Sequence, residues 1–342
     1  MDTSKLVPND PRVRHGSSTV RGKTYQYIIG EPEVNTHLAT VFLIHGFPDL
    51  GFGWRYQVPY LMSLGFRVVV PDMLGYAGTD RPQDLRDFSL KNISSDIKEL
   101  ARRFVGNGQI ILGGHDWGGA LVWRTALWHP ELIKAVFSIC TPFLPPRKNF
   151  IPLEDAIAAG NLTNFRYQLQ FRGPNVENAI QGEDKIRQFL NVLQDEFGID
   201  GETGFSVNKG VIFENLPKQR KSERLSDAEL EFYVQQYMLQ DAPQLRGGLN
   251  WYRTSKINWE EELPLADNNK TILSMPTLFI AATNDSPLPP SMSIGMEQYM
   301  LNLTRGKVES SHWAQREASA DVNELLGKWL DCVLNRSVPS SP

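Results

Sequence analysis

Apolar positions follow two alternating patterns along the first 140 or so residues of this 342-residue chain. Short runs of consecutive apolar residues, typical of buried strands, are followed by segments with apolar residues every three or four positions, typical of amphipathic helices. The predicted strands are 13–20, 23–30, 39–44, 67–71, 109–113 and 135–139, and the predicted helices are 54–64, 87–104 and 120–129. Strands that alternate with helices indicate a mostly parallel sheet covered on both faces.

The pattern changes after a cluster of prolines at 142–146. From there to about residue 265, helical periodicity and loops replace the strand pattern, and Ser226-Asp227-Ala228-Glu229 has the form of a helix-capping box. A strand pattern at 276–282 and a final helical pattern at 317–334 follow. The sequence therefore predicts a core domain built from residues 1–145 and 266–342, with an inserted helical lid domain at residues 146–265.

The segment Gly114-His115-Asp116-Trp117-Gly118-Gly119 lies between a predicted buried strand and a predicted helix. Glycines on both sides of its centre permit a strained backbone and a close approach of the strand and the helix. This arrangement is typical of the sharp turn that presents the nucleophile in an α/β-hydrolase. The central residue is Asp116, and a carboxylate is a better nucleophile for displacement at a saturated carbon than for ester cleavage.

An acid and a histidine follow Asp116 in the chain order that a hydrolase triad of this kind requires. Asp285 lies just after the predicted strand 276–282, and His312 comes later in the chain. We expect Asp285 to orient His312, and His312 to activate a water molecule.

The motif His45-Gly46-Phe47-Pro48 follows the predicted strand 39–44, at the place where these hydrolases assemble an oxyanion hole. We expect the backbone N–H groups of Phe47 and Trp117 to stabilise the Asp116 carboxylate first and a tetrahedral oxyanion later. The side chains of Phe47, Trp117 and Trp313 are expected to line the substrate-binding pocket.

Motifs from nearly the whole chain resemble those of soluble epoxide hydrolases of the α/β-hydrolase fold family. The core motifs are His45-Gly46-Phe47-Pro48-Asp49, Trp54-Arg55-Tyr56-Gln57, Pro71-Asp72-Met73-Leu74-Gly75-Tyr76, Gly114-His115-Asp116-Trp117-Gly118-Gly119 and His312-Trp313, and the lid motifs are Tyr167-Gln168-Leu169-Gln170-Phe171 and Leu249-Asn250-Trp251-Tyr252-Arg253. The resemblance implies an α/β-hydrolase fold, with a mostly parallel eight-stranded sheet flanked by helices and an inserted helical lid. It also implies that the hydroxyl groups of Tyr167 and Tyr252 hold an epoxide oxygen.

The resemblance further implies that the protein converts an epoxide and water to a vicinal diol through a covalent ester on Asp116. A tyrosine hydroxyl is protonated near neutral pH, so Tyr167 and Tyr252 can donate to the oxygen as the ring opens. A small-molecule epoxide is the expected partner. Neither a metal nor an organic cofactor is expected.

Three other functions remain open at this point. A haloalkane or haloacid dehalogenase of the same fold also uses an aspartate at this turn, but halide departure calls for Trp, Asn or Arg donors. An ester or amide hydrolase would need a serine in place of Asp116. A catalytically silent receptor of the same fold would not need an intact triad and a tyrosine pair.

Composition limits the expected partners and cellular location of the protein, but it does not indicate the reaction. The net charge of −4 and the pI near 5.9 do not indicate a positively charged surface for binding nucleic acid. Two cysteines, Cys140 and Cys332, argue against a disulfide scaffold. The chain shows no secretory signal and no apolar run of the ~20 residues that a membrane span needs. We therefore expect a cytoplasmic monomer or homodimer without a membrane span.

Overall fold

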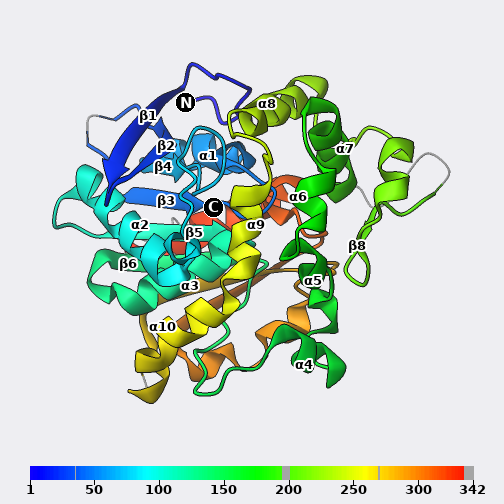
Figure 1. Cartoon of the computed structure of the whole chain (residues 1–342). Helices are drawn as coiled ribbons and strands as arrows, with labels where there is room; N and C mark the ends of the chain where they lie inside the picture. Colours follow the sequence, from blue (N-terminus) through cyan, green and yellow to red (C-terminus); the bar gives the residue numbers. More distant parts are fainter. Residues whose placement is uncertain (35, 195–200, 269, 335–342) are drawn as a thin grey trace.

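The computed structural model describes residues 1–34, 36–194, 201–268 and 270–334 (Figure 1). Within these residues one sheet contains eight strands in the order β1-β2-β4-β3-β5-β6-β9-β10. The strands are β1 Val13–Val20, β2 Lys23–Gly30, β3 Thr40–Ile44, β4 Arg67–Pro71, β5 Ile110–His115, β6 Ile133–Ile139, β9 Leu273–Ala282 and β10 Met300–Val308. β2 runs antiparallel to β1 and β4, and every other pairing is parallel. The predicted mostly parallel eight-stranded sheet is therefore confirmed.

Two pairs of helices pack against this sheet. α2 (Leu90–Val105) packs on α3 (Trp117–Trp128), and α3 contacts β5 and β6. α1 (Gln57–Ser63) contacts β4 and α12 (Ser319–Val333), and α12 contacts β9 and β10. Every residue of β3 and β5 is buried. Burial on both faces explains why the central strands are continuous apolar runs in the sequence.

The predicted boundaries of β1, β2 and β4 agree with the structure, and those of the other predicted elements differ by up to three residues. The predicted helix 54–64 begins only at Gln57, because Gly51–Trp54 forms a short 3₁₀ helix, η1. The hydrophobic pattern did not reveal β10. β10 pairs with β9 at the edge of the sheet and is largely exposed, so it lacks the apolar run of a central strand.

Residues 153–267 contribute no strand to the eight-stranded sheet in the part of the chain that the structure describes. Their helices are α4 Leu153–Ala158, α5 Tyr167–Phe171, α6 Asn175–Ala179, α7 Glu183–Gln194, α8 Asp227–Met238, α9 Arg246–Arg253 and α10 Ser255–Asp267. The short strands β7 (Phe205–Ser206) and β8 (Gly210–Val211) pair with each other. The predicted lid boundary at residue 265 falls inside α10, and the division into two domains stays a prediction.

The green-to-yellow helices of this segment lie beside and in front of the sheet in Figure 1. Two hydrogen bonds connect the segment to loops that follow β3 and β4. The Tyr233 hydroxyl of α8 donates to Asp49 Oδ1 over 2.5 Å, and the Trp251 indole of α9 donates to the Leu74 carbonyl over 3.2 Å. The capping box predicted at Ser226 is present at the start of α8.

Short elements complete the connections. They are the α-helix α11 Ala314–Glu317 and the 3₁₀ helices η2 Leu85–Phe88, η3 Pro130–Leu132, η4 Thr163–Phe165, η5 Phe213–Lys218, η6 Pro290–Ser293 and η7 Met296–Gln298. Within the described ranges, no helix is both long and apolar enough to cross a lipid bilayer.

Candidate active site

Asp116 lies in a sharp turn between β5 and α3, with a backbone conformation of φ 54° and ψ −124°. Positive φ is uncommon for a residue with a side chain. The turn is compact, because a Cβ added to Gly118 would lie 2.1 Å from the Ile44 carbonyl oxygen, and one on Gly114 would lie 2.3 Å from the Gly118 carbonyl oxygen. The Thr141 hydroxyl donates to the Asp116 carbonyl over 2.7 Å. Close backbone packing and this hydrogen bond hold Asp116 at the end of β5.

The Asp116 carboxylate has one backbone donor and one histidine neighbour. The Phe47 N–H donates to Asp116 Oδ1 over 2.8 Å, and His312 Nε2 lies 3.5 Å from Asp116 Oδ2. Among the described residues, no hydrogen bond joins the Trp117 N–H to this carboxylate. Trp117 is the first residue of α3, so its N–H has no acceptor within the helix and is available for an oxyanion.

Asp285 and His312 lie side by side, as the sequence predicts. Asp285 Oδ2 lies 2.9 Å from His312 Nδ1, and the Leu288 N–H donates to Asp285 Oδ1 over 2.8 Å. Burial alone would lower the pKa of His312, but the charges of Asp285 and Asp116 outweigh burial and raise it to about 10. Conversely, burial opposes ionisation of Asp285, but the neighbouring His312 holds the pKa of Asp285 below its ordinary value. The free site therefore favours an imidazolium between two carboxylates.

A chain of hydrogen bonds runs from α8 to the backbone of His312. Tyr233 donates to Asp49, and the Gln315 amide donates to Asp49 Oδ2 over 3.3 Å and lies 3.2 Å from His115 Nδ1. His115 Nε2 lies 2.7 Å from the His312 carbonyl oxygen. Burial lowers the pKa of His115 to about 4, so its ring is neutral and can accept at Nδ1 while it donates at Nε2.

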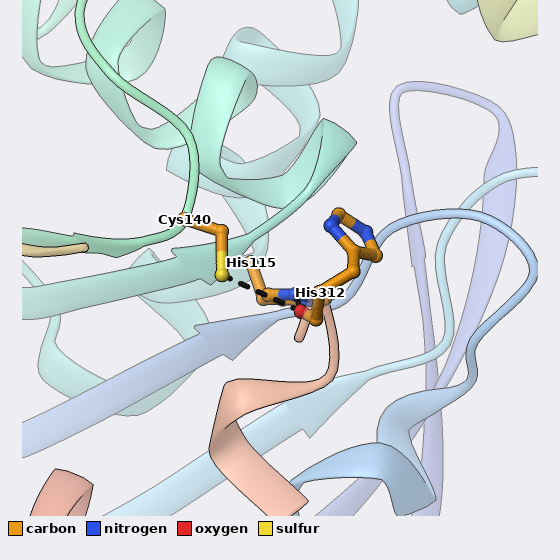
Figure 2. Close-up of side chains that lie close together, drawn as sticks. All are labelled: His115, Cys140 and His312. Atoms are coloured by element: carbon orange, nitrogen blue, oxygen red, sulfur yellow. Dashed lines mark hydrogen bonds between the residues drawn. The ribbon is translucent and has the colours of Figure 1, made fainter. Parts of the chain in front are cut away.

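Cys140 also contacts the backbone of His312. Figure 2 shows His115 and Cys140 beside the His312 carbonyl oxygen, and the Cys140 thiol donates to that oxygen over 3.4 Å. One potential metal ligand atom from each of the three side chains lies within 4.8 Å of the others. However, both His115 nitrogens lie in hydrogen bonds, and burial keeps the pKa of Cys140 well above its ordinary value. A thiol that stays protonated is a poor metal ligand, so these residues do not fit a metal site.

Tyr167 of α5 and Tyr252 of α9 lie close together across the pocket from the core. Their ring centroids are 6.2 Å apart, and the ring of Phe171 lies 5.2 Å from both. Both tyrosines are buried. Burial, together with the nearby Asp116 charge, raises the pKa of each hydroxyl, so both groups stay protonated and can donate.

Two cavities, of about 320 and 230 Å³, meet at Asp116 and Tyr167. The smaller cavity is also lined by Phe47, Tyr252, His312 and Trp313, and the larger by Trp117. The site residues predicted from the sequence therefore all line one or both cavities, except Asp285, which lies behind His312.

The sequence analysis did not predict the residues whose hydrogen bonds lead to the His312 backbone. Asp49 directly follows the His45–Pro48 motif, which was the available signal for it. Gln315, Tyr233 and Cys140 gave no comparable signal, because their partners are far away in the chain. Arg124 and Glu262, which line the larger cavity, were missed for the same reason.

Residues 39–319 match the family described as the alpha/beta hydrolase fold. The chain is 39% identical to "Epoxide hydrolase srdG" from Neurospora crassa, over 96% of this chain and 99% of the relative. It is 36% identical to "Bifunctional epoxide hydrolase 2" from Sus scrofa, over 90% of this chain but only 55% of that protein. The crystal structure of epoxide hydrolase A from Mycobacterium thermoresistibile matches with a TM-score of 0.77 at 26% identity, covering 93% of this chain and 98% of that one. The chain therefore belongs to the α/β-hydrolase fold family, in the group that contains the epoxide hydrolases.

Proposed function

We propose that this protein is an epoxide hydrolase that forms a covalent ester on Asp116 and then hydrolyses it. One observation carries the proposal: a carboxylate with a histidine neighbour shares a cavity with two buried tyrosine hydroxyls. A nucleophile on one side and proton donors on the other suit the opening of a strained ether. The similarity to proteins named as epoxide hydrolases supports the same reaction class.

Asp116 attacks one carbon of the epoxide in the first half of the proposed reaction. A carbon–oxygen bond to the carboxylate forms while the carbon–oxygen bond of the ring breaks. Tyr167 and Tyr252 donate hydrogen bonds to the departing oxygen, and one of them transfers its proton to it. Such general acid assistance is typically worth about 10²–10⁴-fold in rate. The products of this half are a hydroxyalkyl ester and a tyrosinate.

Ester formation in the first half of the reaction leads His312 to lose its proton. Once Asp116 is esterified, it no longer carries the negative charge that helps to raise the pKa of His312. The tyrosinate then takes the imidazolium proton, through water, which restores the tyrosine and leaves a neutral histidine. His312 thus becomes a base only after the ester exists, and Asp285 keeps its ring oriented.

In the second half, His312 takes a proton from water as the water oxygen attacks the ester carbonyl. The Phe47 and Trp117 N–H groups stabilise the tetrahedral oxyanion. Its collapse breaks the ester bond, and the leaving alkoxide takes the proton of the new Asp116 carboxyl group. The diol departs, and the site returns to a carboxylate, an imidazolium and two tyrosines. Every proton is accounted for without a metal or a cofactor.

A single turnover in ¹⁸O-labelled water tests the covalent route. We expect the label in Asp116 and not in the first diol released, as read by mass spectrometry of the peptide and the product. A first-turnover diol with a full ¹⁸O atom would show direct attack by water. If a panel of aryl and alkyl epoxides gave no diol at all while a haloalkane released halide, the dehalogenase alternative would replace this proposal.

A further inference from the structure

Cys140 is the first residue after β6, and it has an unusual backbone conformation. Its φ of 67° lies in the left-handed region, which is disfavoured for a residue with a side chain. The Cys140 N–H donates to the Ile280 carbonyl of β9 over 2.9 Å, and the Thr141 N–H donates to the Ile139 carbonyl over 2.8 Å. A strained backbone that its surroundings hold in place is common at functional sites. A role other than packing is therefore expected for this buried side chain.

The Cys140 thiol lies where the loops after three neighbouring strands meet. β6, β9 and β10 are adjacent in the sheet, and Asp285 and His312 follow β9 and β10 in the chain. The thiol donates to the His312 carbonyl oxygen over 3.4 Å (Figure 2), and it also forms a hydrogen bond with the Asp285 carboxylate. Its sulfur accepts a hydrogen bond from the Ala314 N–H. One small side chain therefore connects the acid, the histidine and the start of α11.

Two points fix the position of the His312 ring, and Cys140 contacts both. The first is the ring nitrogen Nδ1, which lies 2.9 Å from Asp285 Oδ2. The second is the His312 carbonyl oxygen, which lies 2.7 Å from His115 Nε2 and also accepts from the Cys140 thiol. The direction of Nε2, which lies 3.5 Å from Asp116 Oδ2, depends on both points. Since burial keeps the pKa of Cys140 high, the thiol stays protonated and can donate at either point.

We propose that Cys140 is a positioning residue that holds the Asp285–His312 pair in the geometry required for ester hydrolysis. The inference rests on the proposed function, because His312 acts as a base only on the ester of Asp116. During ester formation, the charge of Asp116 attracts His312 and helps to hold its ring. Esterification removes that charge, and the ring is then held by Asp285 and by its own backbone. The hydrogen bonds of Cys140 therefore matter more in the second half of the reaction than in the first.

Separate measurement of the two halves of the reaction tests the proposal. Cys140→Ala removes the thiol and should slow ester hydrolysis about tenfold while the rate of ester formation stays the same. A larger fraction of the enzyme should then carry the ester during turnover, as measured by rapid quenching and mass spectrometry. Cys140→Ser keeps a donor at the same place, so it should restore ester hydrolysis to within about threefold of the wild-type rate.

Two further variants separate the thiol from the backbone and from general effects. Cys140→Gly removes the thiol but suits the left-handed backbone, and it should slow ester hydrolysis as much as Cys140→Ala does. It also replaces the alanine variant in the comparison if that variant does not fold. Cys332→Ala removes an exposed thiol on α12 and should behave like wild type. Thermal unfolding of each variant verifies that it is folded.

Three results would overturn the inference: unchanged ester hydrolysis in Cys140→Ala, equal losses in the alanine and serine variants, or equal slowing of both halves of the reaction. Failure of the proposed function looks different, because then the wild type yields neither ester nor diol from any epoxide. In that case the NMR signal of the His312 Nδ1 proton, which faces Asp285, tests the positioning in the free protein. It should shift or broaden in Cys140→Ala but not in Cys140→Ser. Identical signals in the wild type and Cys140→Ala would again overturn the inference.

Discussion

The core and the helical segment 153–267 hold their reactive groups by different means. In the core, backbone packing and hydrogen bonds fix Asp116, and hydrogen bonds fix Asp285 and His312. In the segment, Tyr167 and Tyr252 are held mainly by contacts between aromatic rings. A nucleophile and a base need a fixed direction of attack, whereas a hydroxyl donor can rotate to its acceptor. The difference suggests that substrate preference can change in the segment while the core chemistry is kept.

Removing the nucleophile is expected to have the largest effect. Asp116→Ala should lower kcat for diol formation by about 10⁴-fold or more, because a group that acts as a unit with His312 is lost. Circular dichroism should show an unchanged fold.

His312→Gln should instead accumulate one equivalent of ester on Asp116, detected as a mass increase equal to that of the substrate. A His312→Gln protein that never gains this mass during turnover would contradict the division of roles within the core.

The tyrosines of the helical segment should contribute less individually than Asp116. Tyr167→Phe and Tyr252→Phe should each slow ester formation by about 10- to 100-fold, and the double variant by about 10²–10⁴-fold. Stopped-flow measurement of the single-turnover phase reports this step. Since a phenylalanine preserves the ring contacts, the thermal unfolding temperature should hardly change. An unaltered rate in the double variant would show that the segment encloses the substrate without donating to it.

Titration of His312 should reveal the charge of Asp116. The pKa of His312, followed by NMR, should lie well above the ordinary value of 6.5 and should fall in Asp116→Asn. Because the folded-state pKa is raised, the stabilisation from this group is complete below about pH 6.5 and is lost as pH rises toward 10. Unfolding by denaturant at several pH values, with His312→Gln as the reference, measures that loss. An identical His312 pKa in the wild type and in Asp116→Asn would refute the proposed coupling between the two residues.

The smallest of these effects concerns the connection between the two regions. Tyr233→Phe removes the hydrogen bond to the buried Asp49 carboxylate and should lower the free energy of unfolding by about 1.5–3 kcal/mol. Tyr237 provides a matched control on the same helix, because its buried hydroxyl has no hydrogen-bond partner among the described residues. Tyr237→Phe should therefore cost little. Equal losses in the two variants would mean that ring packing, not the bond to Asp49, connects α8 to the core.

Sequence reasoning worked best where a feature depends on neighbours in the chain. The boundaries of β1, β2 and β4 and the capping box at Ser226 are local features, and they were predicted correctly. The edge strand β10 was not predicted because it pairs only with β9 and leaves most of its side chains in solvent. It therefore has no apolar run in the sequence. The predicted lid boundary at residue 265 falls inside α10, so the division into two domains stays a prediction.

The sequence by itself determined the kind of nucleophile and its turn, because glycines around Asp116 encode that backbone locally. It also determined the chain order of Asp116, Asp285 and His312. Only the tertiary structure decided what surrounds them: the hydrogen bonds from Tyr233 to the His312 backbone, and the ion pair between Arg124 and Glu262, 138 residues apart in the chain. The physical reason is that a hydrogen bond or a cavity wall depends on distances in space. A sequence pattern records only neighbours along one element.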